Sequence, residues 1–208
     1  MEQLVDVQML GAPLDEVRSG VRNVHGKLQA CRVEMVTVAL AMTSLTAELQ
    51  HICEVCLVPT LLADNGNFLE SHLALSSLQQ VERKLGGLLP WFDTARATNT
   101  FLMESISAIQ TGYEAITGFW PVVAEQFPAE LVGSYTEIAQ ECQGVLEDTR
   151  PLLAQLLAQR RDLELLAALV GVLRTALEGV RAGTLPKATV INMLAMASWP
   201  EPTKAKAA

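Results

Sequence analysis

The sequence is poor in charge, in aromatic side chains and in histidine. Charged residues make up 18% of the 208 residues and aromatic residues 5%, and there are three histidines. Fifteen Lys and Arg stand against 23 Asp and Glu, which gives a net charge of −8. Nucleic acids and anionic membranes are bound through clustered basic side chains. The charge balance therefore argues against both as partners.

Motifs of the common enzyme and nucleotide-binding classes are also missing. The patterns GxGxxG, GxxxxGK[ST], HExxH and GxSxG do not occur. The first residues lack the basic segment and apolar core of a secretory signal. The longest uncharged stretches, 35–47 and 188–200, have 13 residues each, short of the roughly 18 that suggest a membrane helix. We expect no catalytic residue, cofactor, metal or transmembrane helix, in a chain that is cytoplasmic or released without a signal peptide.

Half of the residues are apolar, and they recur at alternating spacings of three and four. Such spacing is typical of an amphipathic helix and not of a strand. Pro13 and the acidic residues after it predict a helix start near residue 14. The turn sequence 64–67 predicts an end near residue 62, so this helix would be roughly 70 Å long. Its apolar series, which we call the first seam, is Leu14, Val17, Val21, Val24, Leu28, Cys31, Met35, Val38, Met42, Leu45, Leu49, Ile52 and Cys56.

Two further series of the same kind follow. Gly118 and Pro121 predict the end of a second helix, with a connecting turn over 121–127, and Pro128 predicts the start of a third, which Gly183 and Pro186 end. The apolar segment 190–194 predicts a short last helix. The second seam is Val81, Leu85, Leu88, Phe92, Ala95, Asn99, Leu102, Ile106, Ile109, Tyr113, Ile116 and Trp120. The third seam is Leu131, Tyr135, Ile138, Cys142, Val145, Thr149, Leu152, Leu156, Gln159, Leu163, Leu166, Val170, Leu173, Leu177 and Val180.

Two prolines lie inside these series without breaking their phase. Pro90 would conflict with the carbonyl of Gly86, four residues earlier, so the second helix is predicted to kink there and continue. Pro151 interrupts the third series, where a capped restart over 148–151 is an alternative to a kinked helix. We take Gly86, Pro90 and Pro151 as the kink sites.

A repeat of three and four over six or seven heptads indicates helices packed side by side in a left-handed supercoil. Short links make neighbouring helices antiparallel. We therefore predict an all-α fold, an elongated antiparallel bundle of about three long, kinked, coiled-coil-like helices plus a short C-terminal helix. It forms one domain over 1–199, with a disordered tail at 200–208. A full turn after the first helix places Val38 level with Trp91, near both kinks.

A second apolar stripe runs beside the first seam, at Val33, Val36 and Leu40. A helix that is apolar most of the way round is buried on several sides, but a three-helix bundle buries one broad face of each helix. We interpret the stripe as a candidate surface for a protein partner, for a second copy of the chain or for lipid in a rearranged state.

For the other candidate sites, a structural role is favoured over a functional one. Cys53 and Cys56 form a CxxC, but a zinc site needs two more ligands at partner spacing, so buried structural cysteines are favoured. Glu48 and His51 form one ExxH, whereas di-metal bundles use two copies. Trp91 and Trp120 lie in or beside the second seam, and core packing is the favoured interpretation for them.

Three functions remain after these observations. Long seams and low charge favour a non-enzymatic interaction or structural protein that presents helical faces to itself or to a protein partner. The helix lengths and arrangement also resemble, in outline only, the α-helical pore-forming toxins of the cytolysin A type, although their long apolar hairpin head is absent. That resemblance implies a membrane-active component. A metal carrier or enzyme of the four-helix type would need buried ligands, and the polar seam residues are only Asn99, Thr149 and Gln159. Membrane-bending domains of the BAR type rank lowest, because they use basic surfaces.

Overall fold

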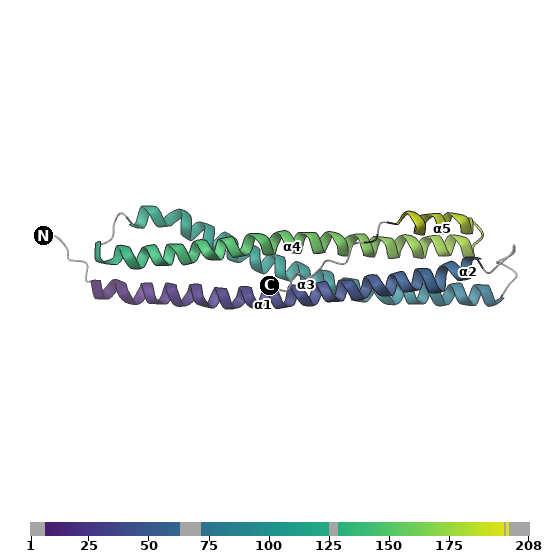
Figure 1. Ribbon diagram of the computed structural model, residues 1–208, viewed down its shortest axis with the longest axis horizontal. Coiled ribbons are helices and arrows are strands. Elements are labelled where there is room, and N and C mark those ends of the chain that lie inside the picture. Colours follow the sequence, from purple (N-terminus) through teal and green to yellow (C-terminus); the bar gives the residue numbers. More distant parts are fainter. Residues whose placement is uncertain (1–6, 63–71, 125–128, 198, 200–208) are drawn as a thin grey trace. The chain divides into compact units, whose positions relative to one another are not determined.

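The computed structural model describes residues 7–62, 72–124, 129–197 and 199. Within these ranges the chain forms helices and no strand (Figure 1). The helices are α1 (Val7–His51), a π-helix η1 (Ile52–Leu57), α2 (Val58–Leu62), α3 (His72–Ala124), α4 (Ala129–Arg181) and α5 (Lys187–Met196). The prediction of an all-α bundle with a short C-terminal helix is confirmed.

Two helix boundaries differ from the sequence prediction. Helix α1 begins at Val7, so Pro13 lies inside it and not at its start. Helix α3 continues through Pro121 to Ala124. A proline has a helical φ and conflicts only with the turn before it, so neither residue has to end a helix. The predicted turn at 64–67 and the tail at 200–208 lie outside the described residues.

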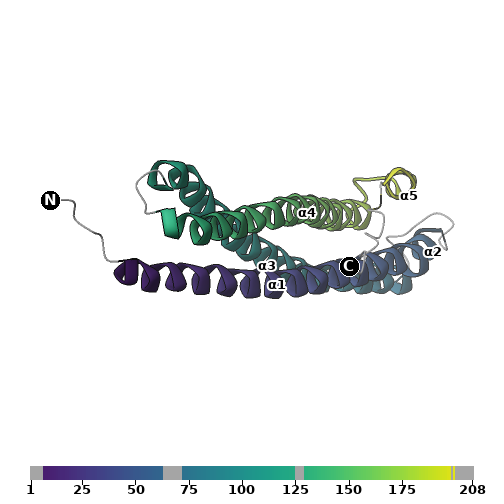
Figure 2. The ribbon, with the colours of Figure 1, turned by 60° about the vertical axis from the view of Figure 1, so that its left-hand side comes forward.

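Helices α3 and α4 are continuous through their internal prolines, and Figure 2 shows each as one ribbon. The alternative of a helix restart at Pro151 is therefore wrong. Thr149 and Leu152, on either side of this proline, are both buried. Packing of the seam on both sides holds the helix together where the proline removes one backbone hydrogen bond.

The chain divides into two compact units, each of which contains a piece of α1, α3 and α4. The first comprises Met1–Met35 and Thr100–Leu157. In it, Arg18 pairs with Glu137 at 2.6 Å and Arg32 with Asp148 at 2.9 Å. Residue numbers rise together along the two helices, so α1 and α4 run parallel in this unit.

The second unit comprises Val36–Asn99 and Ala158–Ala208. Arg181 pairs with Glu82 at 2.9 Å, and the Arg174 guanidinium lies beside Gly86. These contacts make α3 and α4 antiparallel in this unit. Helix α5 packs against α2.

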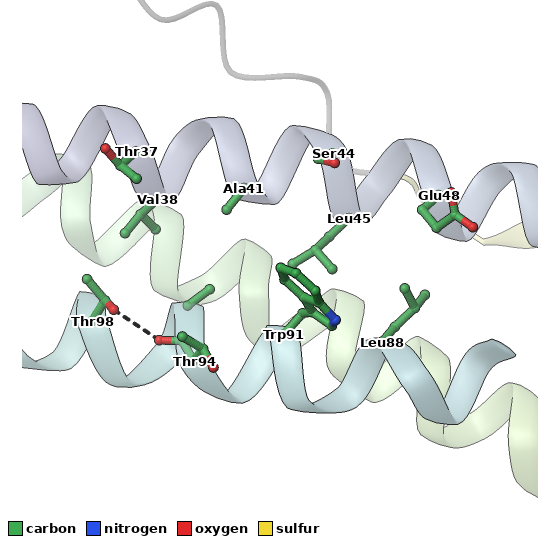
Figure 3. A pocket seen from close by; sticks show the side chains of 11 residues that line it. Thr37, Val38, Ala41, Ser44, Leu45, Glu48, Leu88, Trp91, Thr94 and Thr98 are labelled. Atoms are coloured by element: carbon green, nitrogen blue, oxygen red, sulfur yellow. Dashed lines mark hydrogen bonds between the residues drawn. The ribbon is translucent and has the colours of Figure 1, made fainter. Parts of the chain in front are cut away.

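Helices α1 and α3 are also antiparallel in the second unit, with a register that differs from the prediction. Figure 3 shows Trp91 beside Leu45, whereas Val38 faces the turn that carries Thr98. Val38 was expected level with Trp91, which is off by about two helical turns. The prediction assumed a full turn at 64–67, which falls in the undescribed range between α2, ending at Leu62, and α3, beginning at His72.

The three seams form the core, as predicted. Burial of each large aliphatic side chain contributes about 1.5–3 kcal/mol, so the seams are the main source of stability. Val17 and Ile116, near the outer ends of their series, are exposed instead. The buried seam residues include Leu28, Met35, Leu49, Leu85, Phe92, Leu102, Ile106, Ile138, Leu156, Leu163, Val170 and Leu177.

A π-helical turn shifts the first seam by one residue near its end. The Pro59 ring would clash with the carbonyl of residue 55 in an α-helix. Here the N–H of Val58 instead donates to the carbonyl of Cys53, five residues back. The extra residue in this turn moves burial from the expected Cys56 to Leu57, which is fully buried, while Cys56 is half-buried. The prediction of Cys56 as a seam residue is therefore wrong.

One described helix segment is long and apolar enough to cross a membrane, by length and composition alone. It is Glu16–Leu62, which contains an 18-residue stretch of mean hydropathy 1.3 with at most two charged residues. Of that stretch, 22% is buried. The expectation of no transmembrane helix came from a search for strictly uncharged stretches, whereas this stretch is allowed up to two charged residues.

Candidate functional site

An apolar groove lies between α1 and α3 in the second unit (Figure 3). Its volume is about 480 Å³. The α1 wall consists mainly of small side chains, so the two helices leave an open channel between them. The groove is lined by Thr37, Val38, Ala41, Ser44, Leu45 and Glu48 of α1 and by Leu88, Trp91, Thr94, Ala95 and Thr98 of α3.

The threonines of the α3 wall add little polarity to the groove. The Thr94 hydroxyl donates to the Pro90 carbonyl at 2.9 Å, and the Thr98 hydroxyl donates to the Thr94 carbonyl at 3.1 Å. Each donor is thereby satisfied within its own helix, a common arrangement for threonine in helices. The hydroxyls need no partner from the groove, which can therefore be lined by apolar atoms.

Trp91 is the largest side chain in the groove, and 68% of it is exposed. Figure 3 shows its indole extending toward α1 beside Leu45. The prediction of core packing for Trp91 is wrong, because the neighbouring Phe92 takes the seam position and is fully buried. One residue later on a helix means a rotation of about 100°, and this turns Trp91 out to solvent. The Trp120 side chain lies outside the described part of the chain.

The stripe predicted beside the first seam is exposed. Val33, Val36 and Leu40 have 68%, 48% and 62% of their surface accessible. Leu40 and Thr37 are three residues apart and so lie about 60° apart around the helix. In the second unit, the exposed Leu40 therefore borders the α1 wall of the groove.

The π-helical turn holds both cysteines of the CxxC. Burial, and then the charge of Glu54, raises the pKa of Cys53 to about 12. The half-buried Cys56 accepts a hydrogen bond from the Lys84 ammonium at 3.5 Å. Both thiols are free. Sequence reasoning missed the contact with Lys84, since it depends on the register between two helices.

The ExxH does not assemble with other ligands in the part of the chain that is described. Glu48 and His51 are both exposed, and Glu48 lines the groove. No group of three or more His, Cys, Asp or Glu is arranged to hold a metal ion among these residues.

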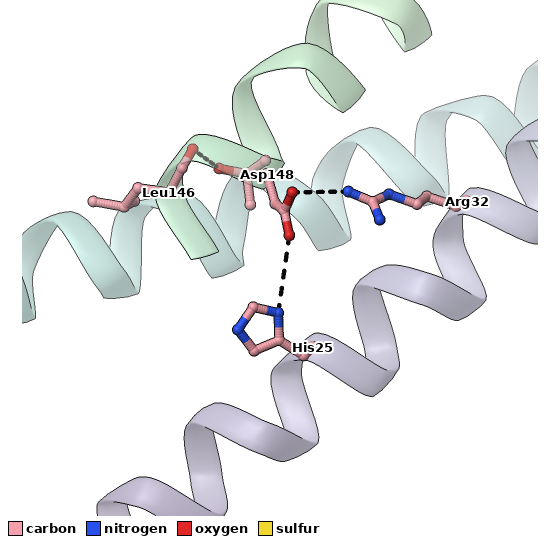
Figure 4. A network of polar contacts seen from close by, with 5 residues as sticks. His25, Arg32, Leu146 and Asp148 are labelled. Carbon is pink, nitrogen blue, oxygen red and sulfur yellow. Dashed lines mark hydrogen bonds and ion pairs between the residues drawn. The ribbon is translucent and has the colours of Figure 1, made fainter. Parts of the chain in front are cut away.

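A small polar cluster joins α1 and α4 in the first unit (Figure 4). Asp148 accepts a hydrogen bond from Arg32 at 2.9 Å, and its other oxygen lies 3.9 Å from Nδ1 of His25. The next residue, Thr149, is buried and donates to the Leu146 carbonyl. His25 and Arg32 are seven residues apart and therefore share a helix face, a signal that the sequence carried. Their partner on α4 could not be chosen from it.

The predicted kink sites lie inside the continuous helices α3 and α4. Pro90 leaves the Gly86 carbonyl without its usual helical donor. A methyl group on Gly86 would lie 3.9 Å from the guanidinium carbon of Arg174, which is ordinary van der Waals contact. Pro151 is exposed.

Comparison of the chain with protein-family models, with curated proteins and with solved structures finds no match. The groove, the exposed Trp91 and the adjoining Leu40 are therefore the features of the second unit from which a function can be proposed.

Proposed function

We propose that the chain is a non-enzymatic interaction protein that binds an apolar helical face of a protein in the α1–α3 groove. The observation that carries this proposal is Trp91, 68% exposed over a groove of about 480 Å³. A large exposed aromatic residue beside a hollow is typical of an interface centre. The small residues of the α1 wall let another helix approach closely, as in recognition of a helix by a groove.

The titratable groups give this proposal indirect support. Cysteines act as nucleophiles when their pKa is lowered, whereas burial raises the pKa of Cys31, Cys53 and Cys142. Catalytic sites are places where pKa values are tuned toward the working pH. The three shifts run in the opposite direction, so these thiols are not activated as nucleophiles.

Site-specific photo-crosslinking tests the proposal. A photoreactive amino acid replaces Thr94 in the groove, and in a matched variant it replaces Leu165, which is 53% exposed on α4. We expect the photoreactive residue at position 94 to form a discrete covalent adduct with a helical segment of the partner protein. The residue at position 165 should form none. Equal labelling from both positions, or none from either, would contradict a specific groove.

A membrane-active component is the second candidate, and one observation favours it. The apolar stretch within Glu16–Leu62 is long enough to cross a membrane and only 22% of it is buried. Burial in the core therefore does not account for its hydropathy. Dye release from zwitterionic and anionic liposomes tests this candidate, and intact liposomes at micromolar protein would remove it.

A further inference from the structure

We propose that the partner received by the α1–α3 groove is a basic amphipathic helix, with an apolar stripe and Lys or Arg beside it. This inference rests on the proposed function and adds the chemistry of the partner. It is carried by the length of the groove and by the distribution of charge around it.

The groove has the length of a short recognition helix. Its α1 wall runs from Thr37 to Glu48, which is about 17 Å at 1.5 Å per residue. About three helical turns fit this length, enough for apolar anchors at positions i, i+3 or i+4, and i+7. Between Thr37 and Ala47 the α1 wall has no charged residue, so the anchors meet no buried charge.

The charge beside the groove is acidic on the α1 side. No Lys or Arg occurs between Arg32 and Arg83, a run that includes all of α1 beyond Arg32 as well as η1 and α2. Glu48 lines the groove at the end of its α1 wall. A basic residue beside the anchors of a partner would meet this carboxylate, and such complementarity speeds association and fixes orientation.

The basic residues of α3 in the second unit are Arg83, Lys84 and Arg96, and the exposed Arg83 does not line the groove. Lys84 donates its hydrogen bond to Cys56, and Arg96 pairs with Asp93 one turn earlier on its own helix. Neither lines the groove. The α3 wall therefore does not reverse the acidic character of the α1 wall.

Charge also decides between this partner and two other occupants. A second copy of the chain would bring the same acidic wall and a net charge of −8, and like charges oppose association. A lipid surface is bound by amphipathic helices through Lys and Arg beside the apolar face, and the α1 wall has none. A basic helix satisfies both the apolar groove and its acidic edge.

Three labelled helical peptides of 18 residues test the inference on the full chain. The first peptide has a leucine stripe flanked by lysine. The second has the same stripe flanked by glutamate. The third has the lysine flanks of the first, with serine in place of leucine. Binding is followed by fluorescence anisotropy at low and high salt. We expect the lysine–leucine peptide to bind about tenfold more tightly than the glutamate–leucine peptide at low salt, with a smaller ratio at high salt because charge is screened.

Two variants and one control locate the interaction. Glu48→Gln should weaken binding of the lysine–leucine peptide about two- to fivefold, whereas Glu178→Gln, at an exposed position on α4, should leave it unchanged. Trp91→Ser should weaken the binding of both leucine peptides more than tenfold. Because Trp91 is mostly exposed, this variant should keep the thermal transition of the parent, which circular dichroism checks.

Each other outcome has a distinct meaning. Equal binding of both leucine peptides, lost in Trp91→Ser, overturns the basic partner and leaves the proposed groove function intact. No binding of any peptide overturns both. A dimer in light scattering that Trp91→Ser abolishes identifies a second copy as the occupant and overturns the inference. Flotation with phosphatidylcholine vesicles that Trp91→Ser abolishes identifies lipid and also overturns it.

Discussion

The Lys84 ammonium donates a hydrogen bond to the thiol of Cys56 across 3.5 Å, between α3 and the π-helical turn η1. This contact is available because the π-helical turn keeps Cys56 at the edge of the core. In a regular α-helix the spacing of the first seam would bury Cys56 and turn Leu57 outward. The contact between Lys84 and Cys56 is therefore a consequence of the one-residue shift in the first seam that accompanies Pro59.

The shift can be tested by truncation of neighbouring residues. Leu57 is fully buried, so Leu57→Ala should lower the free energy of unfolding by about 2–5 kcal/mol. Cys56→Ala removes a half-buried thiol and should cost less than about 1 kcal/mol. Urea denaturation measures both. A larger loss for Cys56→Ala would mean that the seam continues without the π-helical turn.

Cys53 should make stability depend on pH in the alkaline range. Its pKa is raised from 9.0 to about 12 in the folded chain, so folding favours the neutral thiol. Its contribution is complete below pH 9 and falls by about 1.4 kcal/mol per pH unit as the pH rises toward 12. Comparison of the parent with Cys53→Ala isolates this residue. The stability difference between them should narrow steadily above pH 9, and a constant difference would contradict the burial of this thiol.

Two glycines of α4 should respond in opposite directions to alanine. A methyl group on Gly171 meets nothing within 4 Å, whereas one on Gly179 would lie 3.0 Å from Cβ of Leu185. Gly171→Ala should therefore stabilise the chain by about 0.4–1 kcal/mol. Gly179→Ala crowds the turn after α4 and should destabilise it by about 1–3 kcal/mol. Thermal unfolding of the two variants checks this. Equal effects on stability would contradict the close approach of Leu185 to Gly179.

The ion pair between Arg32 and Asp148 should contribute little to stability. Both side chains are more than one-third exposed, so solvent screens the attraction. A double-mutant cycle with alanine should give a coupling of about 0.2–1 kcal/mol at low salt, which disappears near 1 M salt. The same cycle on Arg160 and Glu164, an i,i+4 pair on α4, is the control. A coupling well above 1 kcal/mol would indicate that the cluster with His25 is better shielded than its exposure suggests.

The helices and most of the core followed from the spacing of apolar residues. The polar members of the seams, Asn99, Thr149 and Gln159, are buried as that spacing requires. Spacing is a local property, and helix formation depends on local contacts, so the sequence carries it directly. The helix ends were less predictable, since Pro13 and Pro121 are compatible with a continuing helix.

The groove could not be predicted, because it depends on the register between α1 and α3. Trp91 was expected level with Val38, but it lies beside Leu45, about two helical turns further along α1. The one-residue difference between Trp91 and Phe92 in the second seam also decides which aromatic side chain faces solvent. Tertiary contacts settle both, whereas the exposed stripe at Val36 and Leu40 was visible in the sequence.

Fluorescence quenching of Trp91 tests the groove most directly. In a chain with Trp120→Phe and Trp199→Phe, Trp91 is the single indole. The structure predicts that acrylamide quenches it freely in the chain alone, and that a saturating leucine-striped, lysine-flanked helix protects it. A Trp91 already shielded in the free chain, or one left equally accessible when that helix is bound, would contradict an open groove that receives a helix.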